Sequence, residues 1–239
     1  NGVAYEKELG AKAMWSMKRE SAHADLEIVK VHPWEELEGT LRQVELKGDP
    51  TLFPYVAARI ESLIVNVGEV APLSLYALSG QIELHRQLRE LFLINYALDF
   101  FDLSGAIEFK TGNKEYKISP PIIEVSESDG SKALLVDGIH RFLLAMNLGI
   151  SQVRTVVVSG VPSHFPLVPL PLGWNEVGVY DNVPLEGDKR RFRFLDMTTF
   201  PDISWFSRQK VTPDSCRYFF YRDYSGLGSS GVREPSSKN

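Results

Sequence analysis

The sequence predicts an α/β (α+β) fold in which a small mixed sheet is covered by helices. Short apolar or β-branched runs, typical of strands, recur at residues 26–31, 122–125, 133–136 and 153–161. Residues 81–98 carry leucines on one stripe, which is typical of an amphipathic helix. The stretch "LLVDGIHRFLLAMNLG", residues 134–149, joins a buried strand directly to a helix. Gly149 stands where a helix commonly ends in a left-handed cap.

The remaining patterns complete the expected organisation. Apolar spacing predicts further helices at residues 5–24 and 55–65 and a helical turn at residues 34–37. A hairpin is expected around residues 111–113. We therefore expect four parts in chain order: an N-terminal helix (1–25), a core (26–160) with a helical insertion (50–100), a C-terminal extension packed on the core (161–225), and a flexible tail (226–239).

Composition limits the function classes. The chain has 239 residues, of which 44% are hydrophobic and 24% charged, an ordinary globular balance. The formal net charge of -5 disfavours a nucleic-acid-coating protein, and the single cysteine excludes a disulfide framework and a Cys-cluster zinc site. No apolar run is long enough to cross a bilayer. A cytoplasmic enzyme or binding protein is the expectation, with its oligomeric state open.

The turn at residues 137–141 has the composition of a phosphate site. A helix N-terminus presents unpaired N–H groups to an anion, and Gly138 would let a ligand approach the backbone. His140 and Arg141 could donate to phosphate oxygens, and Asp137 could hold a divalent cation beside them. Alternatively, Asp137 only caps the helix, and the two basic residues are solvated. The residues alone leave both interpretations open.

The same turn carries a family resemblance. "VDGIHRFLLAMNLGISQVRTVVV" and the upstream "ISPPIIEV" resemble the signature of the ParB/sulfiredoxin superfamily, closest in motif to its free-serine kinase branch. The likeness covers residues 118–160 well and 26–48 weakly. It implies a ParB/sulfiredoxin-like core in which Gly138, Ile139, His140 and Arg141 hold nucleotide phosphates.

The resemblance extends to a pair of acids. "VKVHPWEEL" is similar to the stretch in those kinases that carries a catalytic carboxylate, with Glu35 and Glu36 at the acidic positions and Trp34 in place of a histidine. It implies Glu35 as base, Glu36 and Asp137 as further catalytic residues, and Asp137 as metal ligand. The acids could equally occupy a first helical turn for electrostatic reasons. Trp34, Arg190 and Arg191 are the candidate substrate-binding residues, the two arginines from a basic strand expected at residues 188–194.

Departures from the family pattern narrow the activity. Ile139 stands where sulfiredoxins need a nucleophilic cysteine, and the segment after residue 162 does not resemble the helix-turn-helix of partition proteins. The leading hypothesis is an ATP- or ADP-dependent kinase that uses Mg²⁺ to phosphorylate the hydroxyl of a small metabolite such as an amino acid. The alternatives are a regulatory or scaffold protein that binds CTP or ATP without turnover, and a ParB-like nuclease or nucleotide hydrolase.

Overall fold

The computed structural model describes residues 26–112, 114–185, 188–193 and 219–227. The predicted N-terminal helix, Cys216 and most of the predicted tail lie outside the described residues. Within them, mixed sheets and three α-helices confirm the α/β (α+β) class.

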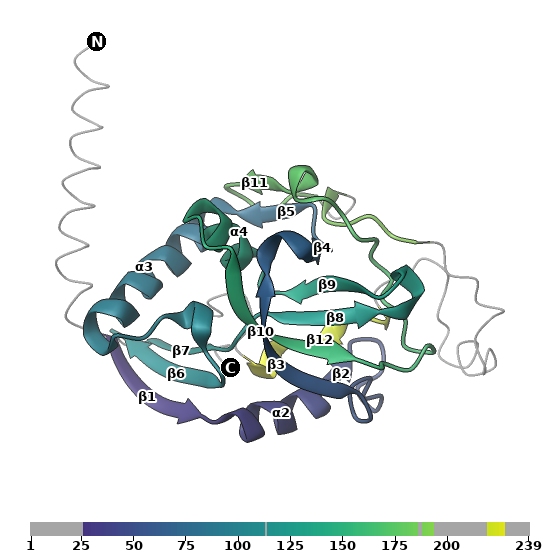
Figure 1. Cartoon of the computed structure of the whole chain (residues 1–239), viewed down its shortest axis with the longest axis horizontal. Helices are drawn as coiled ribbons and strands as arrows, with labels where there is room; N and C mark the ends of the chain where they lie inside the picture. The colour runs from purple at the N-terminus through teal and green to yellow at the C-terminus, as the bar shows by residue number, and fades with distance from the viewer. Residues whose placement is uncertain (1–25, 113, 186–187, 194–218, 228–239) are drawn as a thin grey trace, which may run out of the picture.

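A five-stranded mixed sheet forms the centre of the molecule, in the order β3-β10-β8-β9-β4 (Figure 1). β10 pairs antiparallel with β3 and parallel with β8, β8 pairs antiparallel with β9, and β4 pairs parallel with β9. The strands are β3 (Arg59–Asn66), β4 (Ala71–Pro72), β8 (Ile122–Ser126), β9 (Lys132–Asp137) and β10 (Gln152–Ser159). The strands predicted at residues 122–125, 133–136 and 153–161 are thus confirmed, and the first two pair as a hairpin.

The strand-to-helix unit is confirmed as well. β9 ends at Asp137, and α4 (Ile139–Asn147) begins after Gly138 and leads into β10. Gly149 is left-handed, with φ of 70°. The amide of Ile150 donates to the carbonyl of Ala145 at 2.9 Å, the cap expected where such a glycine follows a helix.

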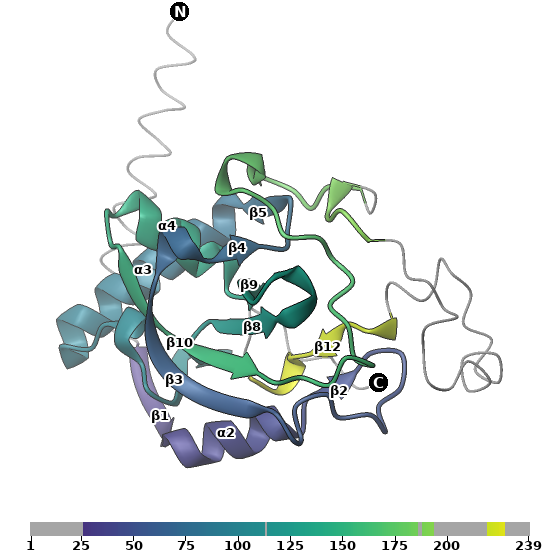
Figure 2. The ribbon, with the colours of Figure 1, turned by 45° about the vertical axis from the view of Figure 1, so that its right-hand side comes forward.

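The helix predicted over residues 55–65 is wrong. Residues 59–66 form β3, which pairs with β10 over eight residues (Figure 2). Ile60, Leu63 and Ile64 have the i, i+3, i+4 spacing of a helix, but isoleucine also favours strands, and long-range pairing with β10 decides the outcome. The expected helical insertion therefore contributes two strands to the central sheet and one helix, α3 (Ser79–Tyr96). The predicted domain boundaries themselves stay predictions.

Smaller sheets surround the centre. β1 (Leu26–His32), β6 (Ala106–Thr111) and β7 (Lys114–Ile118) form a three-stranded antiparallel sheet that includes the predicted hairpin. β5 (Tyr76–Leu78) pairs with β11 (Gly178–Tyr180), and β2 (Glu45–Leu46) with β12 (Arg222–Asp223). The basic strand expected at 188–194 is wrong as far as it is described. Residues 188–193 contain a single bridge, between Phe192 and Pro169.

Helices cover opposite faces of the central sheet. Because side chains alternate along a strand, Val153 and Ile123 join the hydrophobic cluster with α3 and α4, whereas Val156 and Ile122 join the cluster with α2 (Trp34–Arg42). Figures 1 and 2 agree, with α4 above the sheet and α2 below it in both views. The predicted turn at 34–37 is therefore the start of a longer helix.

Candidate functional site

The candidate site is built on the turn between β9 and α4. Gly138 has φ of 101°, a conformation that L side chains rarely adopt. An added Cβ would lie 2.7 Å from the Cβ of Pro121. Glycine is thus required here by backbone conformation and by contact with Pro121, which sets the start of α4 close to the start of β8.

Arg141 points into the protein. Its Nη2 lies 3.0 Å from Oδ2 of Asp137, and its Nη1 donates to the carbonyl of Ser119. The Arg141 and Asp137 side chains are only 3% and 5% exposed. Burial lowers the pKa of Arg141, and the Asp137 carboxylate opposes that shift. The buried Arg141 side chain therefore stabilises the turn through Asp137 and Ser119. The family resemblance implies a different role, that of a phosphate ligand at the surface.

The first turn of α4 leaves donors available. The amide of Phe142 makes the first intrahelical bond, to the carbonyl of Gly138 at 3.0 Å. The amides of Ile139, His140 and Arg141 precede it and so have no acceptor within the helix. These N–H groups and the helix dipole favour an anion at this end of α4.

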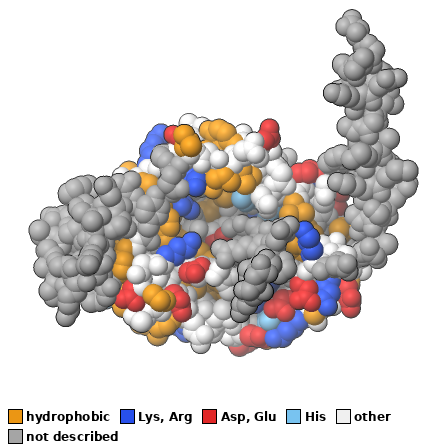
Figure 3. Space-filling view, turned by 180° about the vertical axis from the view of Figure 1, so that it is seen from behind, with side chains coloured by type: hydrophobic (Ala, Val, Ile, Leu, Met, Phe, Trp, Pro, Cys, Tyr) orange, Lys and Arg blue, Asp and Glu red, His pale blue; other side chains and the backbone are white. Residues whose placement is uncertain are grey.

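A pocket of about 340 Å³ opens beside this helix end. Its volume is at the lower end of the range for small-molecule sites. The turn contributes Asp137, Gly138, Ile139 and His140 to the lining, and Arg190 contributes a cation. Figure 3 shows, on the back of the molecule, a hollow in which a histidine is visible, bordered by hydrophobic, Lys and Arg side chains.

Two buried histidines lie beside the pocket. The ring of His140 stacks on that of His85 from α3, with centroids 6.1 Å apart and planes at 16°. Burial, with the nearby Arg141 guanidinium, lowers the pKa of His140 to about 4 and that of His85 to about 3. Both imidazoles are therefore neutral at pH 7.

This pair predicts acid sensitivity. The unfolded histidines titrate near 6.5 and the folded ones near 4 and 3, so the unfolded state binds more protons below pH 6.5. The contribution of the two neutral histidines to the free energy of unfolding is thus fully present above about pH 6.5. It falls as the pH drops toward 4, by about 1.4 kcal/mol per pH unit for each histidine. Urea unfolding at pH 7, 6 and 5 measures this slope. His85→Gln should reduce it and the exposed His164→Gln should not; equal slopes in all three proteins would contradict the prediction.

The two predicted acids lie elsewhere. Glu35 and Glu36 are exposed in the first turn of α2, on the sheet face opposite α4, and neither is among the residues that line the pocket. Glu36 accepts hydrogen bonds from Lys30 at 2.8 Å and from His32 at 2.7 Å, and both interactions lower its pKa. Trp34 packs against the hydrophobic cluster of α2. The structure therefore does not bring Trp34, Glu35 or Glu36 to the pocket with Asp137.

The two candidate arginines differ. Arg190 lines the pocket, and its guanidinium lies 4.8 Å from the ring centroid of Tyr221. In the part of the chain that the structure describes, no carboxylate pairs with Arg190. Arg191 instead forms an ion pair with Glu176 and does not line the pocket. Only Arg190 is placed to meet an anion there.

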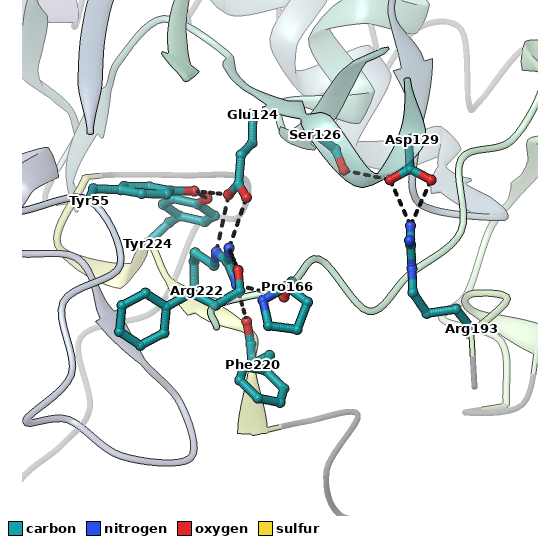
Figure 4. Close-up of polar contacts among 10 residues, drawn as sticks. Tyr55, Glu124, Ser126, Asp129, Pro166, Arg193, Phe220, Arg222 and Tyr224 are labelled. Carbon is teal, nitrogen blue, oxygen red and sulfur yellow. Dashed lines mark hydrogen bonds and ion pairs between the residues drawn. The ribbon is translucent and has the colours of Figure 1, made fainter. Parts of the chain in front are cut away.

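A buried polar cluster was missed at the sequence level. Arg222 forms a bidentate pair with Glu124, at 3.1 and 2.8 Å, and Tyr55 donates to the same carboxylate at 2.7 Å (Figure 4). Arg222 is only 6% exposed. The available signal was a charge inside each of two apolar runs, "PPIIEVS" and "YFFYRDY". This cluster fastens β12 to the central sheet.

Among the described residues, no group of three or more His, Cys, Asp or Glu side chains could hold a metal ion. Asp137 would therefore need the oxygens of a bound phosphate to complete a Mg²⁺ site. Within the same residues, no helix combines the length and apolar character needed to cross a membrane.

Comparison with known families decides the relationship. The family model for the ParB CE domain matches residues 36–178, which is more than half of the chain. The chain belongs to the ParB CE domain family. The expected ParB-like core is confirmed, and the matched segment contains the whole Asp137–Arg141 turn but not Glu35. No curated protein and no solved structure matches the chain.

Proposed function

We propose that this ParB CE domain binds a nucleotide in the α4 pocket and uses it as phosphoryl donor to the hydroxyl of a small metabolite. The observation that carries the proposal is the N-terminus of α4, whose first three amides have no acceptor within the helix and whose residues Ile139 and His140 line a pocket together with Arg190. Backbone amides and a guanidinium donate hydrogen bonds to phosphate oxygens, and the positive end of the helix dipole attracts the phosphate charge.

The carboxylate of Asp137 fits this proposal through a cation. A carboxylate beside a phosphate is repulsive unless a positive charge lies between them. Mg²⁺ in phosphate sites is commonly bound by one or two carboxylates together with the phosphates and water. Asp137 would therefore orient Mg²⁺ against the nucleotide, while Arg141 behind it holds the carboxylate in place.

A second candidate is nucleotide binding, of ATP or CTP, without transfer. The position of Glu35 favours it, because a base must reach the attacking hydroxyl and Glu35 does not line the pocket. Asp137 is the carboxylate that does line it, and Asp137 is already paired with Arg141. Binding is common to both candidates, so it is tested first.

Calorimetry with ATP, ADP and CTP in the presence of Mg²⁺ tests binding. We expect micromolar affinity for at least one nucleotide, and about tenfold or greater weakening in Arg190→Ala, the size expected for a charged hydrogen bond. Arg191→Ala is the matched control, because it removes the same charge one residue away from the pocket wall. Absence of binding by every nucleotide would rule out both candidates.

Formation of ADP then distinguishes phosphoryl transfer from nucleotide binding without transfer. With ATP and a panel of hydroxylated metabolites, a kinase forms ADP only when an acceptor is present. Because Glu35 does not line the pocket, Glu35→Gln should leave both nucleotide affinity and any such transfer unchanged. Loss of transfer in Glu35→Gln would contradict transfer in this pocket. Tight binding with no acceptor-dependent ADP would favour the regulatory candidate.

A further inference from the structure

Three polar atoms beside the pocket lack hydrogen-bond partners. They are Oε1 of Gln81 and both ring nitrogens of His140, all buried and all unpaired within the described residues. His140 is only 8% exposed. Buried polar side-chain atoms are nearly always paired, so an unpaired group of this kind at a pocket wall indicates a partner that arrives with a ligand.

The two side chains come from different helices and line the same pocket. Gln81 lies in the first turn of α3 and His140 in the first turn of α4. His85 connects them: its Nδ1 lies 2.7 Å from the carbonyl oxygen of Gln81, and its ring stacks on His140. Because a carbonyl only accepts, Nδ1 of His85 carries the hydrogen. The hydrogen bond therefore orients the His85 ring, and the His140 ring packs against it before any ligand binds.

The chemistry of this wall selects an uncharged group. The amide oxygen of Gln81 accepts a hydrogen bond, and a neutral imidazole donates from one nitrogen and accepts at the other. A hydroxyl, which both donates and accepts, satisfies these atoms. A carboxylate does not, because it only accepts hydrogen bonds and would leave Oε1 of Gln81 without a donor. Leu78, Ile139 and Val183 supply apolar surface for the carbon skeleton.

We propose that Gln81 and His140 bind hydroxyl groups of the ligand, so that the pocket selects a phosphorylated polyol. The ribose phosphate of a nucleotide is one member of this class. The inference rests on the proposed function, because the phosphate occupies the α4 end of the same pocket. Gln81 and His140 are then the residues that determine specificity, and α3 supplies half of the polar wall.

The test compares three probes by calorimetry: glycerol 3-phosphate, n-propyl phosphate and inorganic phosphate. We expect wild-type protein to prefer glycerol 3-phosphate over propyl phosphate by about tenfold, the effect of roughly one neutral hydrogen bond. Gln81→Leu should remove that preference and leave the affinity for inorganic phosphate unchanged. Gln87→Leu is the control on the same helix, because Gln87 bonds to Glu83 at 2.9 Å and does not line the pocket.

The possible results test hydroxyl recognition separately from the proposed binding of phosphate. Equal affinity for the two organic phosphates in wild-type protein, or an unchanged preference in Gln81→Leu, would overturn the polyol inference and leave phosphate binding standing. Loss of the preference in Gln87→Leu would overturn it too, since the effect would not arise at the pocket wall. Failure of all three probes and of every nucleotide to bind would overturn the proposed function, and the inference with it.

Discussion

Replacing Arg222 with methionine should lower the free energy of unfolding by about 3–5 kcal/mol, the cost of leaving one partner of a buried ion pair uncompensated. The Arg222 and Glu124 side chains are 2% and 4% exposed, so water cannot replace the lost contacts. Arg222 also donates to the carbonyl oxygens of Phe220 at 2.7 Å and Phe165 at 2.8 Å, and these acceptors would lose a donor. Chemical denaturation of the two proteins measures the difference.

Two further variants identify the cause. Arg59→Met removes an arginine paired with Glu61 at 2.7 Å, but Arg59 is 73% exposed, so a change below about 1 kcal/mol is expected. The double variant Glu124→Leu/Arg222→Met should recover part of the loss, because no buried charge is left unpaired. It should not recover all of it, since Tyr55 would lose its acceptor. Equal stabilities of Arg222→Met and Arg59→Met would refute the role assigned to the buried cluster.

Replacing Arg141 with methionine should also cost about 3–5 kcal/mol, because Asp137 would keep a buried charge without its guanidinium. The reason matters for function. If Arg141 stabilises the turn without touching the ligand, Arg141→Met lowers ligand affinity only because the turn and the fold are disturbed. Thermal unfolding and nucleotide binding measured on the same preparation separate these effects.

The control for Arg141 is Arg154→Met. Arg154 pairs with Asp102 at 2.7 Å, but that carboxylate is 69% exposed, so little change in stability is expected. A fully stable Arg141→Met protein that no longer binds nucleotide would contradict the stabilising role assigned to Arg141. It would support instead the direct phosphate contact that the family resemblance implies.

The two arginines show where sequence patterns stop being informative. Asp137 and Arg141 are only four residues apart, but Asp137 ends β9 and Gly138 is left-handed, so the i, i+4 rule for helices does not predict their pairing. That Arg141 is buried, and therefore unavailable to solvent, depends on Ser119 and Pro121 from a distant segment. Glu124 and Arg222 are 98 residues apart, and no local rule pairs them.

Only part of the pocket could likewise be predicted from the sequence. The β9–Gly138–α4 turn was predictable because glycine conformation and helix ends follow local chemistry. The polar wall was not, because His85 and Gln81 come from α3 while His140 comes from α4. Likewise, the family resemblance suggests a catalytic role for Glu35 and Glu36 of α2, yet α2 packs on the other face of the sheet.

The sequence by itself determined the α/β class, the strand–turn–helix unit ended by Gly149 and the resemblance to ParB-like domains, because each depends on residues that are neighbours along the chain. Tertiary structure decided that residues 59–66 form a strand and that Arg141 faces inward. It also decided that Arg190, rather than Arg191, lines the pocket. Strand pairing, burial and pocket lining are set by contacts between distant segments, and apolar or charged patterns alone do not specify which segments meet.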